Sequence, residues 1–146
     1  MEPGTPCPVA SGRRVSPDFG VALGGGPVYP VGLGSDGVLQ YVLGDERGGF
    51  PGPWGGQKVL WVAPPDFGGA VLVRGHRMDG LEEVRFGLGA DPLPELRLVA
   101  GEGGSSPSGW RNWPGYTRVR APGRHAYQID TARESYTIVF RAERAP

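Results

Sequence analysis

The chain has 146 residues, of which 27 are glycine and 16 are proline, and its formal net charge is zero. This length fits one domain with a hydrophobic core of its own. A neutral chain has no global field that would attract nucleic acid, so nucleic acid is not expected as a partner. Glycine and proline lie between apolar runs and do not replace them, which indicates a domain of many strands joined by tight turns.

The amino-terminal part, residues 1–26, is rich in proline and glycine and has one apolar run of strand length, at 19–23. This composition is typical of an extended arm or linker, and we expect residues 27–146 to form a single β-domain. The first residues lack the basic and apolar segments of a signal peptide. The protein is therefore either cytosolic or a secreted chain whose leader has been removed. We favour the second alternative, because small all-β domains with polar, extended amino termini are typical outside the cell.

Cys7 is the only cysteine of the chain, so an internal disulfide is excluded. Three states stay open for its thiol: free, modified with lipid, or joined to another chain. Cys7 is thus the candidate residue for tethering the protein to a membrane or to a larger assembly.

Short apolar runs follow at a spacing that leaves no room for crossover helices, so we expect antiparallel sheets. Val59–Ala63 is apolar at every position, as in a central strand covered on both sides, and it supplies Trp61 as the predicted core tryptophan. Val84–Leu88 alternates and should have one face in water. The strands expected before residue 100 are 28–33, 38–43, 58–63, 70–74, 84–88 and 96–99.

The segment Tyr116–Ala142 contains three further runs separated by turns, which predicts a closing meander of strands. Ile138 and Phe140 share one face of the last strand, and Tyr127 and Ile129 share one face of the strand before it. Tyr127 stands where many immunoglobulin-like sandwiches have a tyrosine whose hydroxyl bonds to nearby backbone. The predicted fold is an all-β, immunoglobulin-like antiparallel β-sandwich of 7–9 strands with an extended amino-terminal arm.

Patterns of known chemistry are present only in fragments. Residues 32–37 match the glycine pattern of dinucleotide-binding loops, but a strand follows them where that pattern needs a helix. His76 and His125 have none of the spacings of metal sites, and we expect both at the surface or capping turns. No serine has the surroundings of a nucleophile elbow. The sequence therefore predicts no catalytic residue, no metal and no cofactor.

An aromatic cluster at 110–116, together with Trp54 in an earlier loop, is the candidate binding surface. Tryptophan, tyrosine and arginine side chains are suited to stack on a sugar ring or to anchor a protein partner. They are also suited to close one end of a sandwich, with arginine reaching solvent, and we favour this structural role. The candidate residues are Trp54, Trp110, Arg111, Trp113 and Tyr116.

Three segments, 110–119, 122–130 and 138–142, resemble a family of uncharacterised small bacterial proteins, many of them secreted or lipoprotein-like. The resemblance extends from about Lys58 to the end of the chain and is looser over Cys7–Leu43. It implies a β fold and a location outside the cytoplasm, and it supplies no active site. Relatives often carry cysteine where this chain has His125, so a bond between that cysteine and the amino-terminal one would leave Cys7 here without its partner.

The first functional hypothesis is a non-enzymatic, extracytoplasmic interaction or structural module with a protein partner, tethered to a membrane or a larger assembly through its arm. The alternative is a carbohydrate-binding module that uses the loop tryptophans, which would require exposed, roughly coplanar rings on one surface. An enzyme is the third hypothesis, and it would need His76 or His125 within hydrogen-bond reach of a carboxylate in a pocket.

Overall fold

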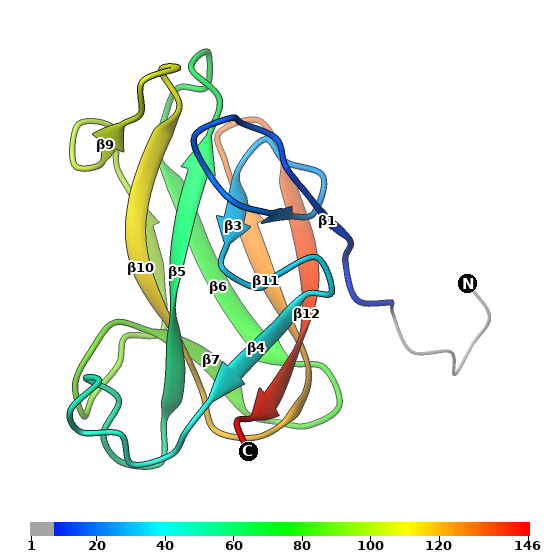
Figure 1. Ribbon diagram of the computed structural model, residues 1–146, viewed down its shortest axis with the longest axis vertical. Coiled ribbons are helices and arrows are strands. Elements are labelled where there is room, and N and C mark those ends of the chain that lie inside the picture. Colours follow the sequence, from blue (N-terminus) through cyan, green and yellow to red (C-terminus); the bar gives the residue numbers. More distant parts are fainter. Residues whose placement is uncertain (1–7) are drawn as a thin grey trace.

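The structure, a computed structural model, describes residues 8–146, and these form β-strands and no helix (Figure 1). The expectation of an all-β chain is confirmed. Within the described range no helix could span a membrane. The twelve strands are β1 (Gly12–Arg13), β2 (Ala22–Leu23), β3 (Tyr29–Val31), β4 (Val38–Tyr41), β5 (Gly55–Ala63), β6 (Val71–Arg77), β7 (Glu83–Phe86), β8 (Leu96–Leu98), β9 (Gly104–Ser105), β10 (Arg111–Val119), β11 (Gly123–Asp130) and β12 (Ser135–Arg144).

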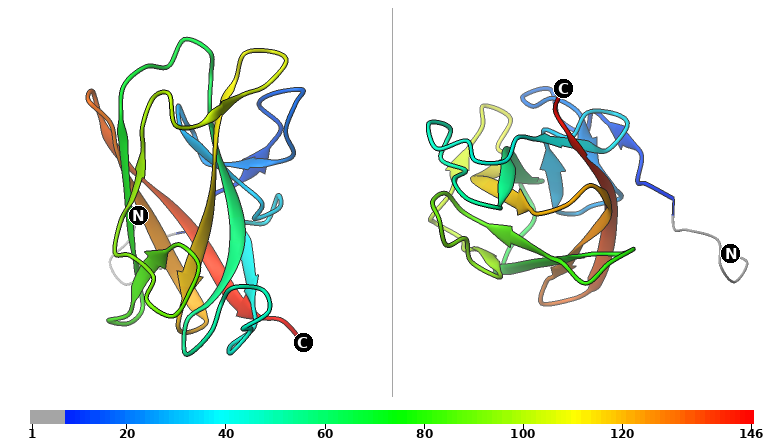
Figure 2. Two further views of the ribbon diagram at one scale, coloured as in Figure 1. Left: turned by 90° about the vertical axis from the view of Figure 1, so that its left-hand side faces the viewer. Right: turned by 90° about the horizontal axis from the view of Figure 1, so that it is seen from below.

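The strands form one curled sheet in the order β1-β2-β3-β5-β10-β7-β6-β11-β12-β4, while β8 pairs with β6 and β9 pairs with β10. The sheet curls like a half-barrel, so that its two halves face each other (Figure 2). β7 links the halves, because it pairs with β10 at Arg85 and with β6 at Val84. The sheet is therefore continuous through β10, β7 and β6, and its two halves are not separate sheets.

Strand number and direction differ from the prediction. β1, β2 and β9 have two residues each. Those of β1 and β9 do not stand out as apolar runs, and β2 forms only the end of the apolar run at 19–23. β4 and β12 run parallel, with Val38 opposite Arg141 and Tyr41 opposite Arg144, so the expectation of purely antiparallel pairing was wrong. The intervening strands themselves connect this parallel pair, and no crossover helix is needed. The immunoglobulin-like sandwich of 7–9 strands is not confirmed.

Aromatic side chains from both halves fill the core. Trp61 is fully buried, as predicted, and its ring meets that of Tyr127 edge to face at 4.9 Å. Tyr127 also stacks on Phe140 at 4.5 Å. The Tyr127 hydroxyl lies 2.7 Å from the Thr117 hydroxyl of β10, so its partner is a side chain and not the backbone group expected for a tyrosine corner. These contacts hold β5 and β10 against β11 and β12.

The period-two patterns of the sequence are confirmed by burial. Val84 and Phe86 are buried while Arg85 between them is half-buried. Ile129 and Ile138 point into the core from their strands. Strand faces were therefore readable from alternation alone.

The amino-terminal segment covers the outer face of β5 instead of extending away from the domain. Ala22 and Leu23 are buried, and β2 pairs with β3 to extend the sheet. Val62 of β5 forms a second apolar cluster with Ala22 and Tyr29, against which Leu60 also packs. This burial explains why β5 is apolar at both faces. Residues 8–26 thus differ from the expected arm, because a few apolar side chains between the turns are enough to attach them.

A polar contact fastens the same segment at its middle. The Asp18 carboxylate accepts hydrogen bonds from the Ser106 hydroxyl at 2.5 Å and from the Ser108 amide at 3.0 Å. The Ser106 and Ser108 hydrogen bonds lower the pKa of Asp18. The segment is therefore joined to the loop before β10 as well as to the sheet.

Arg118 holds two loops to the outer face of β10 at the other end of the domain. Its side chain is fully buried and donates to the carbonyl oxygens of Trp54 at 2.7 Å and Pro51 at 3.2 Å. It also donates to the carbonyls of Gly87 at 2.9 Å and Gly89 at 2.7 Å. A planar guanidinium with five donors suits this arrangement of four acceptors.

Replacing Arg118 by lysine should destabilise the protein. Lysine keeps the charge but cannot reach both loops with a planar fork, so buried carbonyls lose their donors and the free energy of unfolding should fall by about 2–3 kcal/mol. Denaturant unfolding measures this change. The exposed Arg47 provides the control, and Arg47→Lys should leave stability unchanged. Equal stability of the Arg118→Lys variant would contradict the role of the guanidinium.

Candidate ligand-binding cleft

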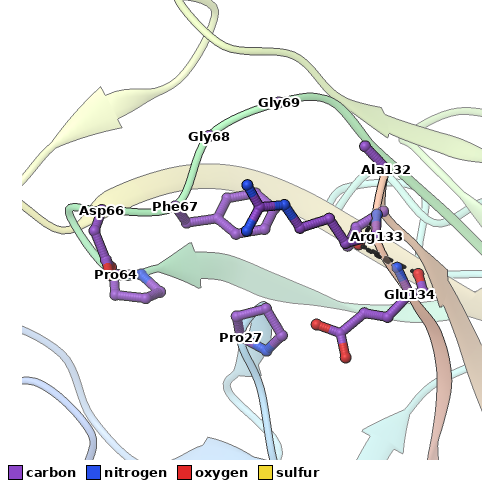
Figure 3. A pocket seen from close by; sticks show the side chains of 10 residues that line it. Pro27, Pro64, Asp66, Phe67, Gly68, Gly69, Ala132, Arg133 and Glu134 are labelled. Atoms are coloured by element: carbon purple, nitrogen blue, oxygen red, sulfur yellow. Dashed lines mark hydrogen bonds between the residues drawn. The ribbon is translucent and has the colours of Figure 1, made fainter.

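Three loops enclose a cleft of about 620 Å³ at one end of the sheet (Figure 3). They are the β5–β6 loop, the β11–β12 turn and the segment before β3. Pro27 and Phe67 give the cleft apolar surface, and charged side chains line it from both sides. This volume lies in the range common for small-ligand sites. The lining residues are Pro27, Pro64, Asp66, Phe67, Gly68, Gly69, Thr131, Ala132, Arg133 and Glu134.

The β5–β6 loop is fixed by its backbone. The Phe67 amide donates to the Pro64 carbonyl at 3.0 Å, which closes a tight turn directly after β5. The Phe67 carbonyl accepts a hydrogen bond from the guanidinium of Arg111 on β10 at 2.9 Å. The half-buried Phe67 ring packs against the main core. This wall of the cleft is thus attached to the sheet by one polar and one apolar contact.

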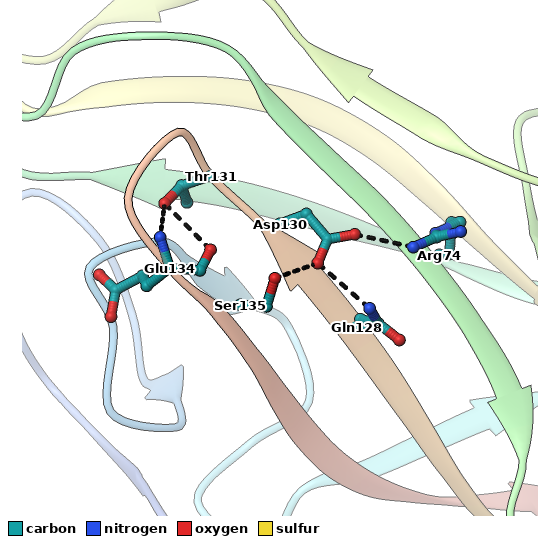
Figure 4. Close-up of polar contacts among 6 residues, drawn as sticks. All are labelled: Arg74, Gln128, Asp130, Thr131, Glu134 and Ser135. Carbon is teal, nitrogen blue, oxygen red and sulfur yellow. Dashed lines mark hydrogen bonds and ion pairs between the residues drawn. The ribbon is translucent and has the colours of Figure 1, made fainter.

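The β11–β12 turn is fixed by Thr131 (Figure 4). Its hydroxyl accepts from the amides of Arg133 at 3.2 Å and Glu134 at 3.1 Å, and the Thr131 amide donates to the Glu134 carbonyl at 2.8 Å. Such side-chain bonds to nearby backbone are how threonine stabilises short turns. The charged side chains of Arg133 and Glu134 remain outside this network.

Asp130 ties the base of this turn to the neighbouring strands. Its carboxylate accepts from Ser135 at 2.6 Å, Gln128 at 3.1 Å and Arg74 at 2.9 Å (Figure 4). The hydrogen bonds from Ser135 and Gln128 lower the pKa of Asp130, with Arg74 adding to them. The carboxylate therefore stays ionised at neutral pH and holds the turn in register.

Tyr136 fixes the third wall. Its hydroxyl donates to the Val28 carbonyl at 2.8 Å and accepts from the Val28 amide at 2.9 Å. Burial raises the pKa of Tyr136 to about 12, so the hydroxyl stays protonated and can donate. Pro27 lies directly before this anchored residue. All three walls of the cleft are thus bonded to the framework before any ligand arrives.

The charged side chains of the cleft are free to meet a ligand. Asp66, Arg133 and Glu134 are exposed and form no ion pair with another described residue. Two carboxylates and one guanidinium give these three side chains a net charge of minus one. The cleft can therefore offer apolar surface, an anionic rim and one cationic group.

The tryptophans proposed as a binding surface do not form one platform. Trp113 is 5% exposed; its ring lies in the core and its indole nitrogen donates to the Val99 carbonyl at 3.0 Å. Trp54 is 8% exposed, with the guanidinium groups of Arg85 and Arg120 at 5.1 and 5.2 Å from its ring. Neither ring is open for stacking on a sugar.

The two remaining aromatic rings lie apart from each other. Trp110 packs on Tyr29 at 6.3 Å, over the outer apolar cluster. Tyr116 lies against Phe50 at 6.1 Å. Six residues along an extended strand separate Trp110 from Tyr116 by about 20 Å. None of the predicted site residues lines the cleft, and only Arg111 is connected to it, through its hydrogen bond to the Phe67 carbonyl.

The two histidines have different positions. His76 is exposed, as expected. His125 is fully buried and stacks on Phe140 at 5.5 Å. Of its two predicted roles, at the surface or capping a turn, the surface position was therefore wrong, while its Nδ1 does bond to the Gly123 carbonyl at 2.9 Å. Alternation explains the error, since position 125 shares the inward face of β11 with Tyr127. Neither imidazole makes a hydrogen bond to a carboxylate among the described residues. Cys7 lies outside the described residues.

The cleft was missed from the sequence because its walls are connections of ordinary turn composition. Its charged side chains, at 66, 133 and 134, gave the strongest available signal, since they lie in the short connections that follow β5 and β11. In residues 8–146 no group of three or more His, Cys, Asp or Glu side chains is placed to hold a metal ion.

Comparisons with protein-family models, with curated proteins and with solved structures find no match to this chain.

Acid should destabilise the protein through His125. Burial lowers the pKa of His125, although a hydrogen bond from its Nδ1 to the Gly123 carbonyl at 2.9 Å acts against this. Its Nε2 is buried without a partner, which disfavours a second N–H there. Below about pH 6.5 the imidazole of His125 is protonated in the unfolded chain but stays neutral in the folded one. The free energy of unfolding therefore falls by at most about 1.4 kcal/mol per pH unit as the pH is lowered.

Chemical denaturation between about pH 7.5 and about pH 5.5 tests this, since the window spans the ordinary imidazole pKa and stays above those of carboxyl groups. His125→Gln should remove the loss of stability across the window. His76→Gln, at an exposed position, should retain it. An unchanged pH dependence in the His125→Gln variant would show that another group titrates.

Proposed function

We propose that this protein is a non-enzymatic interaction module that binds a protein partner through the cleft between the β5–β6 loop, the β11–β12 turn and Pro27. The observation that supports it is the anchoring of all three walls, by Arg111, Thr131 and Tyr136. Binding to loops that are already ordered costs less conformational entropy than binding to loose ones. The unpaired charged groups at the rim supply contacts for a ligand.

We place this module outside the cytoplasm, attached to a membrane or a larger assembly through its amino-terminal residues. The support is the family resemblance of the sequence and the presence of Cys7 ahead of the segment that packs on β5. We also propose a relationship to immunoglobulin-like domains, supported by the two facing halves of the sheet and by Tyr127 in the core between them. Two features argue against that relationship: β7 joins the two halves into one sheet, and β4 and β12 run parallel.

A carbohydrate-binding module is the second candidate, and the geometry supports it less. Its rings would have to be exposed and coplanar, whereas Trp54 and Trp113 are buried and Trp110 lies far from Tyr116. A rearrangement of the surface loops would not expose Trp113, because its ring belongs to the main core.

Site-specific photocrosslinking in the protein's own host tests the interaction module. A photoreactive residue at the exposed Ala132, in the wall of the cleft, should give a discrete adduct with a protein partner. The same group at the exposed Lys58 of β5, outside the cleft lining, is the matched control and should give none. The adduct is expected in the extracytoplasmic fraction.

The design separates the parts of the proposal. Equal adducts from both positions would argue against the cleft as the contact surface. Recovery of all the protein in the cytosolic fraction would overturn the proposed location. A change of tryptophan fluorescence on addition of a polysaccharide would favour the carbohydrate module.

A further inference from the structure

We infer that the cleft recognises an extended basic peptide segment, in which an arginine or lysine side chain follows an apolar one. This inference rests on the proposed function and adds the chemistry of the partner. Three features of the cleft carry it: the charge of its rim, the shape of its apolar floor and the position of its own arginine.

The charge of the rim favours a cation. Asp66 comes from the β5–β6 loop and Glu134 from the β11–β12 turn, so carboxylates reach the cleft from two of its walls. Neither has an ion-pair partner in the described part of the chain. A basic group in the cleft would be attracted by both carboxylates, whereas an acidic group would be repelled by both. Complementarity therefore selects a positively charged residue.

The floor of the cleft suits a long side chain with an apolar stem. Phe67, Pro27 and Pro64 contribute apolar surface to the lining of the cleft. Arginine and lysine lay their methylene groups on such surfaces and keep the charge at the edge, and a guanidinium can also stack over a phenylalanine ring. A neighbouring apolar residue of the peptide would cover the rest of this surface.

The β5–β6 loop also offers room and backbone groups to an extended chain. A β-carbon added to Gly68 or Gly69 would meet no heavy atom within 4 Å. The amide and carbonyl groups of these two residues take part in none of the turn and loop hydrogen bonds of the described residues. An approaching peptide backbone can therefore come close to this loop and bond to it, as in other modes of extended-peptide recognition.

Arg133 of this chain resembles the basic residue proposed for the partner and would compete with it for the cleft. Figure 3 shows its side chain extending from the β11–β12 turn, which also carries Glu134, toward Phe67 of the β5–β6 loop. A basic group is thus already directed at the position proposed for the basic residue of the partner. Removal of this guanidinium changes the net charge of the three rim side chains from minus one to minus two and vacates its space. Arg133 should accordingly weaken the binding of a basic peptide.

Amide chemical-shift titration of the full chain with three capped peptides tests the inference. The peptides are acetylated and amidated Gly-Phe-Arg-Gly and its counterparts with Gln or Glu in place of Arg. The arginine peptide should shift the amides of Gly68, Gly69 and Thr131 and bind most tightly. Asp66→Asn combined with Glu134→Gln should weaken it between about twofold and tenfold, as expected for exposed ion pairs. Arg133→Ala should strengthen it.

Matched variants control for unrelated charge effects. Asp36→Asn and Arg47→Ala change exposed groups outside the cleft and should leave the affinity unchanged. Equal or tighter binding of the glutamate peptide at the same amides would overturn the proposed preference for a basic residue. The cleft would then still be a peptide-binding site. If none of the three peptides shifts the cleft amides, the inference fails; a crosslinked partner at Ala132 would still uphold the proposed function.

Discussion

Tyr127 joins the two halves of the sheet, and the rest of the domain depends on this contact. Its ring meets Trp61 from the opposite half at 4.9 Å and Phe140 from its own half at 4.5 Å, and Phe86 near the corner at 6.4 Å. Its hydroxyl reaches Thr117 of β10, so the buried polar atom is satisfied across the core. Burial raises the pKa of Tyr127 far above its ordinary value, which keeps this bond between neutral groups.

Both ends of this framework are held by arginines that bind backbone carbonyls and, among residues 8–146, no carboxylate. At one end Arg118 gathers the loops around Trp54 and Gly87, and at the other Arg111 holds the loop at Phe67. A carbonyl satisfies a guanidinium without adding a second charge that would have to be desolvated. The consequence differs at the two ends. Arg118 is sealed beneath its loops, whereas the loop held by Arg111 is open on its outer side and forms a cleft wall.

Local patterns predicted the strands and their faces, and long-range contacts decided the remainder. Trp61 and Phe140 could be assigned to the core because alternation is a property of each strand by itself. The surface alternative for His125 was wrong although the residue follows the same alternation, because its polarity was given more weight than its position. The segment before β3 and the cleft could not be predicted, since they depend on pairs as distant as Val28 and Tyr136, 108 residues apart. The glycine and proline residues of this segment indicate turns, and turns occur both in a segment that packs on the domain and in a free arm.

The aromatic cluster at 110–116 gains a different meaning from the structure. Its sequence allowed a ligand platform or a structural role. Trp113 lies in the core, and the guanidinium of Arg111 is 5.4 Å from the centre of its ring. That guanidinium is the group that holds the Phe67 carbonyl. Cation–π contact restricts the arginine to one orientation, so the tryptophan positions the cleft wall through it. Substitutions in the cluster would then change ligand binding without touching a ligand, and loss of binding alone cannot distinguish a contact residue from a support.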